Sequence, residues 1–182
     1  MVKQKFINEL IKLSSEVYKH LGGGTYDEKD YQKALGHEFS QKNIEYLREI
    51  HIELFYKKIP LKLGAPDFYF NKIKPPAILE VKLGSGLEEI NRQQLKMYLL
   101  SISKSTNPIL RNVREGYLLN FLKVEPSTEI HHEKKNKKEY YKIEVEHYRL
   151  NDNKKFKLLN KPYKVGPFNI TDQQSEISQT KL

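Results

Sequence analysis

The stretch APDFYFNKIKPPAILEVK, residues 65–82, carries acidic and basic side chains inside two short apolar runs. The two runs are separated by a turn-forming segment with a pair of prolines. Because side chains alternate between the faces of a strand, Glu80 and Lys82 share one face and lie about 6–7 Å apart. Twelve residues separate Asp67 from Glu80, so a hairpin between the two runs brings Asp67 beside Glu80.

Around this stretch, the spacing of apolar residues predicts both helices and strands. The first predicted helix ends before the three glycines that begin at Gly22. The further predicted elements are helices at about 28–42 and 87–103 and strands at 44–56, 66–70, 77–83, 115–122 and 140–150. A helix between two strands indicates a parallel crossover, so we expect an α/β (α+β) fold with a central mixed sheet flanked by helices.

We expect residues 1–122 to form the core and residues 123–182 to form a basic C-terminal extension with one further strand and a polar end. The charged segment 129–141 contains the pair His131-His132. Its composition is typical of a solvated loop rather than of a metal site.

The composition limits the partners and the compartment. The 182 residues carry a net charge of +9, which suits a polyanionic partner, although lysine-rich chains also arise without one. The absence of cysteine excludes disulfides, thiolate zinc sites and iron–sulfur clusters, and it fits a reducing compartment. No run approaches the roughly 20 apolar residues of a membrane span, so we expect an intracellular, cytoplasmic protein with no membrane partner.

Two carboxylates that converge on one point repel each other unless a cation or a proton lies between them. Oxygen ligands with room for water are what Mg²⁺ prefers, and a lysine beside Asp67 and Glu80 can stabilise charge that develops on a phosphate. The purely structural alternative is that Asp67 ends a strand while Glu80 and Lys82 pair on a solvated face of the sheet.

Two predicted helices also place polar side chains on stripes that should be apolar. Glu38 follows Tyr31 and Leu35 on the core-facing stripe of the second helix, and Gln94 and Tyr98 lie near the middle of a stripe on the third. A buried polar group costs about 1–3 kcal/mol if it is left unpaired, so a shared polar site explains these positions. For Gln94 alone, a solvated position at the edge of the stripe is the alternative.

The order Pro-Asp, twelve residues, Glu-Val-Lys resembles the PD-(D/E)XK nuclease superfamily, whose restriction-endonuclease-like core is a mixed sheet flanked by helices. The chain is also similar, over about residues 7–122, to the GxxExxY family in the RecB-like branch. The similar segments are LGGGTYDEKDYQKALGHEF (21–39), residues 66–82, QLKMYL (94–99) and GYLLNF (116–121). The chain departs from the family pattern at two places. It has an extra residue between Gly24 and Glu28, and the sequence leading to Asp67 reads LGAPD.

The resemblance implies an enzyme, a Mg²⁺-dependent nuclease that hydrolyses phosphodiester bonds in nucleic acid, in DNA rather than RNA, with Mn²⁺ as a substitute metal. It implies that Asp67, Glu80 and the backbone carbonyl of Val81 bind the metal. Lys82 is then the catalytic lysine, and Glu38 is a further ligand or a group that positions water.

Gln94 and Tyr98 match the Q-x-x-x-Y helix motif of the branch, which implies contact with DNA or support of the site. Without the resemblance, the residues are also compatible with two other functions. One is a nuclease fold that binds nucleic acid or a protein partner without useful turnover, and the other is a structural scaffold with surface charges.

Overall fold

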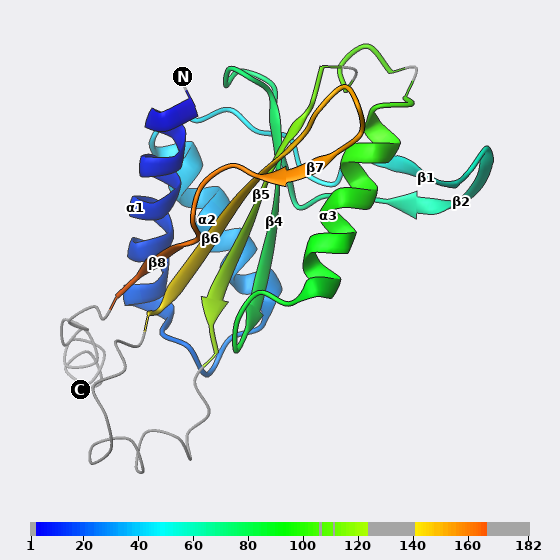
Figure 1. Cartoon of the computed structure of the whole chain (residues 1–182). Helices are drawn as coiled ribbons and strands as arrows, with labels where there is room; N and C mark the ends of the chain where they lie inside the picture. The colour runs from blue at the N-terminus through cyan, green and yellow to red at the C-terminus, as the bar shows by residue number, and fades with distance from the viewer. Residues whose placement is uncertain (1–2, 106, 111, 124–140, 167–182) are drawn as a thin grey trace, which may run out of the picture.

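A computed structural model of the chain describes residues 3–105, 107–110, 112–123 and 141–166 (Figure 1). The elements are α1 (Lys3–Leu21), α2 (Glu28–Gln41), β1 (Ile52–Tyr56), β2 (Ile59–Gly64), β3 (Phe68–Phe70), β4 (Ala77–Gly84), α3 (Glu89–Ile102), β5 (Glu115–Leu122), β6 (Ile143–Leu150), β7 (Phe156–Leu158) and β8 (Tyr163–Val165). None of the helices in these ranges is long and apolar enough to cross a membrane.

The central sheet has six strands in the order β3-β4-β5-β6-β7, with β8 also paired to β6. The β4–β5 pair is parallel and is connected by α3, whereas the other pairs are antiparallel. The sheet is therefore mixed, and the crossover predicted between the third and fourth strands is present. This architecture confirms the predicted α/β fold with a mixed sheet flanked by helices.

Helices cover both faces of the sheet and enclose two cores, with α1 and α2 on one side and α3 on the other (Figure 1). On β4 the alternation is clear, since Leu79 and Val81 belong to the core under α1 and α2, while Ile78 belongs to the core under α3. The period of two therefore sends Glu80 and Lys82 to the α3 side. Both β4 and β5 are buried along most of their length, as expected of strands covered on both faces.

Local sequence fixes the start and the end of α2. Asp27 is the N-cap, and its side chain and that of Asp30 form a reciprocal capping box with the two backbone N–H groups. The following Glu28 therefore stands in the first turn of the helix. At the other end, Asn43 adopts a left-handed φ of 53°, the conformation in which asparagine commonly ends a helix.

The prediction of one long strand over 44–56 is wrong for the first half of that range. Only residues 52–56 form β1, and the segment before it makes one isolated bridge, between Leu47 and Tyr69. Glu49 has a φ of 54°, which interrupts any extended run. β1 pairs with β2, a strand not predicted from the sequence, in a two-stranded hairpin that projects from the rest of the fold (Figure 1).

The strand predicted at 140–150 is β6, and it lies inside the sheet, paired with β5 along its length. Two short strands that were not predicted, β7 and β8, pair with β6. The boundary after residue 122 stays a prediction, although the strand beyond it completes the same sheet as the core. The segment with His131-His132 and the polar C-terminal end lie outside the described residues.

A buried glutamate that pairs with side chains of the neighbouring strand gives a prediction for stability. Glu115 is fully buried and accepts hydrogen bonds from Arg149 Nε at 2.8 Å and from the His147 ring at 2.8 Å. Glu115→Ala leaves the buried His147 ring without this hydrogen-bond partner, whereas the Arg149 side chain is 46% exposed and can reach water. We therefore expect a loss of about 1–3 kcal/mol in the free energy of unfolding. Urea titration tests this against Glu53→Ala, an exposed glutamate, which is expected to change stability by less than about 0.5 kcal/mol.

Candidate active site

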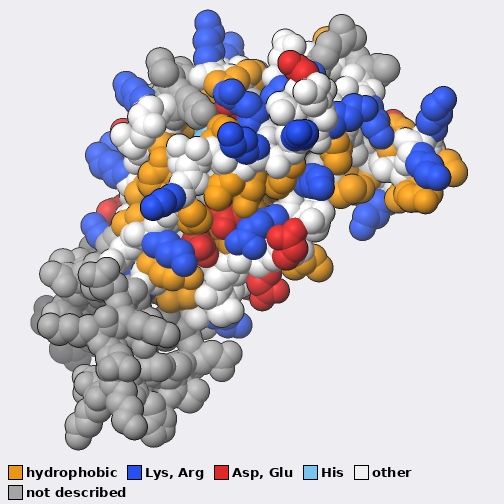
Figure 2. Space-filling view, in the orientation of Figure 1, with side chains coloured by type: hydrophobic (Ala, Val, Ile, Leu, Met, Phe, Trp, Pro, Cys, Tyr) orange, Lys and Arg blue, Asp and Glu red, His pale blue; other side chains and the backbone are white. Residues whose placement is uncertain are grey.

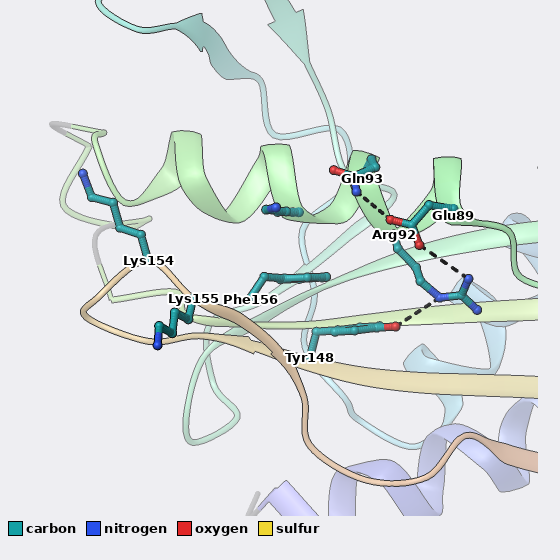
Figure 3. A pocket seen from close by; sticks show the side chains of 8 residues that line it. Glu89, Arg92, Gln93, Tyr148, Lys154, Lys155 and Phe156 are labelled. Atoms are coloured by element: carbon teal, nitrogen blue, oxygen red, sulfur yellow. Dashed lines mark hydrogen bonds and ion pairs between the residues drawn. The ribbon is translucent and has the colours of Figure 1, made fainter.

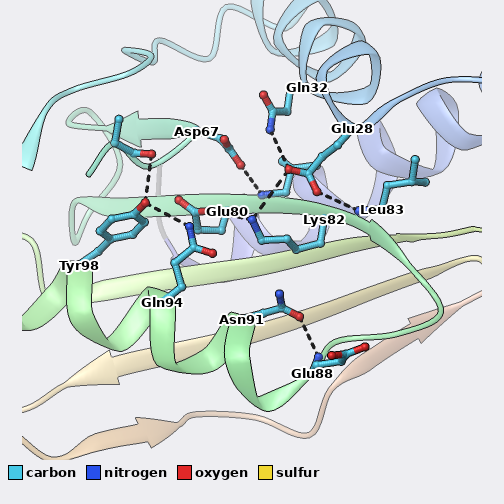
Figure 4. A network of polar contacts seen from close by, with 12 residues as sticks. Glu28, Gln32, Asp67, Glu80, Lys82, Leu83, Glu88, Asn91, Gln94 and Tyr98 are labelled. Carbon is cyan, nitrogen blue, oxygen red and sulfur yellow. Dashed lines mark hydrogen bonds and ion pairs between the residues drawn. The ribbon is translucent and has the colours of Figure 1, made fainter. Parts of the chain in front are cut away.

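The β3–β4 hairpin brings Asp67 next to Glu80. Phe68 pairs with Leu79 in the antiparallel register, so the preceding residue, Asp67, falls opposite Glu80. Asp67 Oδ2 accepts a hydrogen bond of 2.7 Å from the backbone N–H of Val81, which fixes the aspartate against the middle of β4 (Figure 4). The pairing expected from the sequence is therefore present.

Lys82 lies between two carboxylates. Its Nζ donates a hydrogen bond to Glu80 Oε2 at 3.2 Å and lies 3.9 Å from Glu28 Oε1. The other oxygen of Glu28 accepts a hydrogen bond of 3.3 Å from the backbone N–H of Leu83. Glu28 therefore connects the start of α2 to β4 at the position of the lysine (Figure 4).

The structure places Glu28, and not Glu38, beside this cluster. Glu38 stands ten residues further along α2, which is about 15 Å of helix rise and a different angle around the axis. It is half-buried, and among the described contacts it has none with Asp67, Glu80 or Lys82. The inward face of α2 runs through Tyr31, Gln32, Leu35, Gly36 and Phe39, so Glu38 lies at the edge of the stripe that was expected to carry it.

Gln94 and Tyr98 flank the cluster from α3. Gln94 Nε2 donates to the Tyr98 hydroxyl at 3.1 Å, and that hydroxyl contacts the carbonyl of Ala65 at 3.4 Å (Figure 4). The Tyr98 ring also packs on Gly64, where a Cβ atom would lie 2.6 Å from it. These contacts hold the segment just before Asp67 against α3.

Several polar residues near the cluster were not singled out from the sequence. Gln32 donates to Glu28 at 3.5 Å and accepts from Arg48 at 3.1 Å, so a chain of contacts orients Glu28 from behind. On β5, Asn120 is fully buried opposite Lys82 and donates to the carbonyl of Gly84 at 3.1 Å. The sequence did hold a signal for Glu28, because it is the glutamate of the Glu28-x-x-Tyr31 motif.

Burial perturbs both carboxyl groups, and the charge of Asp67 adds to the shift of Glu80. Burial raises the pKa of Asp67 to about 6, against the opposing hydrogen bond from Val81. Burial, followed by the charge of Asp67, raises the pKa of Glu80 to about 8. For Lys82, burial lowers the pKa, but the neighbouring carboxylates outweigh it and the net shift is upward. At neutral pH the ammonium of Lys82 is therefore charged. Of the two carboxyl groups, Glu80 holds a proton more strongly than Asp67 does, unless another cation takes the place of that proton.

The donor set fits a divalent cation with an incomplete protein shell. Glu80 is 1% exposed, and its Oε1 has no hydrogen-bond partner among the described residues. A buried carboxylate oxygen without a partner is costly unless a cation or water reaches it. In the described ranges no group of three or more His, Asp or Glu is placed to hold a metal ion. Mg²⁺ commonly uses one or two carboxylates and keeps several waters, which matches Asp67 and Glu80.

A family model described as the PD-(D/E)XK nuclease superfamily matches residues 4–133. No significant match was found among curated proteins or among solved structures. The matched range includes both strands of the hairpin, the α3 crossover and β5. With more than half of its length matched, and with the mixed sheet described above, the chain belongs to the PD-(D/E)XK nuclease superfamily.

Proposed function

We propose that the protein is a Mg²⁺-dependent nuclease of the GxxExxY family that hydrolyses phosphodiester bonds, with DNA as its substrate. The observation that carries the proposal is the convergence of Asp67, Glu80 and Lys82 on the α3 side of β4. The superfamily consists of nucleases that typically use divalent metals, and the net charge of +9 suits a nucleic-acid substrate.

Asp67 and Glu80 are the residues that would hold Mg²⁺, with the carbonyl of Val81 as a further ligand. The bound ion would supply a Lewis acid for the phosphate and lower the pKa of a water molecule. Lys82 places a positive charge beside the same point and stabilises the charge that develops on the phosphate oxygens. Glu28 holds the ammonium of Lys82 in place, and Tyr98 holds the Asp67 segment.

Incubation of the purified chain with linear, circular and single-stranded DNA and with RNA tests the proposal. We expect cleavage of DNA with Mg²⁺ or Mn²⁺, and none with EDTA. Salt-dependent binding of DNA without cleavage of any substrate would contradict the enzyme and support a binding module of the same fold. Preferential cleavage of RNA would contradict only the proposed substrate, DNA, and not the nuclease activity.

The two glutamates of α2 form a matched pair for a second prediction. Glu28→Gln removes the carboxylate 3.9 Å from Lys82 Nζ, so we expect cleavage to fall by about 10- to 100-fold, as for other groups that orient a metal site from behind. Glu38→Gln, the same change on the same helix, should leave the rate within about twofold. Initial rates of DNA cleavage measure both. A greater loss for Glu38→Gln would show that Glu28 is not the helix acid of the site.

A further inference from the structure

A second polar site lies on the other flank of α3. A pocket of about 580 Å³ opens between α3 and the β6–β7 turn, and its lining includes Arg92, Lys96, Lys154, Lys155 and Phe156 (Figure 3). This volume falls within the range of about 300–1,000 Å³ that is common for ligand sites. None of these five residues belongs to the cluster around Glu80.

The walls of the pocket are held in place by buried contacts. Arg92 donates two hydrogen bonds to the buried carboxylate of Glu146, at 2.9 and 2.7 Å, and one to the Tyr148 hydroxyl at 3.2 Å. Its remaining nitrogen, Nη1, is 3.9 Å from Glu89. The guanidinium is therefore fixed on one side, while Nη1 is placed toward the edge of the pocket where Glu89 stands (Figure 3).

The turn that carries the two lysines is also ordered. The side chain of Asn151 accepts a hydrogen bond of 2.7 Å from the backbone N–H of Lys155, and its backbone N–H donates to the Lys155 carbonyl at 3.0 Å. Lys154 adopts a left-handed φ of 57° within this turn, a conformation that disfavours most side chains. The turn thus holds both exposed lysines at the pocket.

Charge and aromatic surface occur together at this pocket. Glu146 balances Arg92, so Lys96, Lys154 and Lys155 face Glu89 alone and leave an excess of two positive charges. Phe156 lines the pocket and is stacked on Tyr148, with ring centroids 4.3 Å apart and an angle of 5° between the rings. Lysines beside a supported aromatic ring are typical of sites that bind the phosphates and unpaired bases of a single strand.

We propose that this pocket binds one or two nucleotides of a single-stranded segment of the substrate. The substrate class rests on the proposed function. The pocket has the size of a small-molecule site and takes a short piece of a strand rather than a duplex. Tyr148 is on β6 and Glu80 on β4, two strands away, which is about 10 Å across the sheet. A short single strand leading away from the cleaved bond spans that distance around α3.

Binding of fluorescein-labelled oligo-dT or oligo-rU in EDTA, measured by anisotropy at several salt concentrations, tests this inference. Lys154→Asn/Lys155→Gln removes two charges with a residue at 154 that tolerates a left-handed φ. We expect affinity to fall by about tenfold or more and the slope of log K against log salt to weaken by about 1.4. Phe156→Leu should lower affinity by about tenfold with the slope unchanged.

The matched control is Lys5→Gln/Lys12→Gln, which removes two exposed charges from α1 on the opposite face of the sheet and should keep affinity within about twofold. An equal loss in control and pocket variants would overturn the inference, and so would unchanged binding by folded Phe156→Leu. If that variant does not fold, the lysine pair decides, since both side chains are exposed. Free dTMP bound as tightly as the strand would identify a mononucleotide site instead.

The two proposals fail in different ways. Strand binding at the pocket by a protein that cleaves nothing contradicts the proposed function alone. Metal-dependent cleavage, together with pocket variants that bind the strand like the control, contradicts this inference alone.

Discussion

Glu80→Gln is expected to abolish Mg²⁺-dependent cleavage and, at the same time, to make the metal-free fold increasingly more stable than wild type as pH rises from 5 to 8. The carboxylate is buried, one of its oxygens has no partner among the described residues, and Asp67 lies beside it. A neutral amide of the same shape removes both the burial cost of the charge and the repulsion. The same change removes a metal ligand, so we expect cleavage to fall by about 10³-fold or more.

The sign of the pH dependence follows from the raised pKa. The pKa of Glu80 is about 8 in the folded chain against an ordinary value of 4.5. The folded chain therefore retains a proton that the unfolded chain releases, and stability falls as pH rises through that window. Glu80→Gln lacks this decline. The free energy of unfolding of the variant should therefore exceed that of wild type by an amount that grows from pH 5 to pH 8 and reaches about 2 kcal/mol or more.

Urea unfolding in EDTA at a series of pH values measures this effect, with Glu38→Gln as the control on a half-buried glutamate. Asp67, whose pKa is also raised, is present in wild type, Glu80→Gln and Glu38→Gln alike, so its own titration is common to the three proteins. A stability difference between wild type and Glu80→Gln that does not change with pH would contradict the buried, repelled carboxylate. Retained cleavage in the variant would contradict its role as a metal ligand.

Lys82→Met should lower the turnover number by about 10³-fold, because it removes the cation that stabilises developing charge on the phosphate. Lys82 Nζ lies 3.2 Å from Glu80 Oε2, so its charge also opposes a metal ion there. We therefore expect the variant to bind Mn²⁺ at least as tightly as wild type, which separates catalysis from metal binding.

Single-turnover cleavage and calorimetric titration with Mn²⁺ measure the two effects of Lys82→Met. Lys33→Met, a change at a side chain that is 73% exposed on α2, is the control and should alter neither. If Lys82→Met lost metal affinity in proportion to its rate, the lysine would act by maintaining the carboxylates rather than in the chemical step.

Local sequence was sufficient for the β3–β4–α3–β5 unit. Period-two alternation in AILEVK and a proline-containing turn specify which face each side chain of β4 takes, and both are short-range features. The parallel crossover followed from a helix between two buried strands. Asp67, Glu80 and Lys82 could be placed together for this reason.

Periodicity could not predict which glutamate of α2 lies beside Lys82. Glu28 and Glu38 are on the same helix, and a stripe of apolar spacing favoured Glu38. Tertiary structure places Glu28 near Lys82, because the first turn of α2 meets β4 at Leu83. Likewise, the left-handed backbone at Glu49 that shortens the predicted strand over 44–56 has no signature in an alternating apolar run.

The most direct test of the site is an anomalous difference map from crystals soaked in Mn²⁺. We expect a peak between the carboxylates of Asp67 and Glu80, in wild type and in Lys82→Met, and its loss in Glu80→Gln. A peak elsewhere, or crystals of active protein with no peak between these two carboxylates, would contradict it.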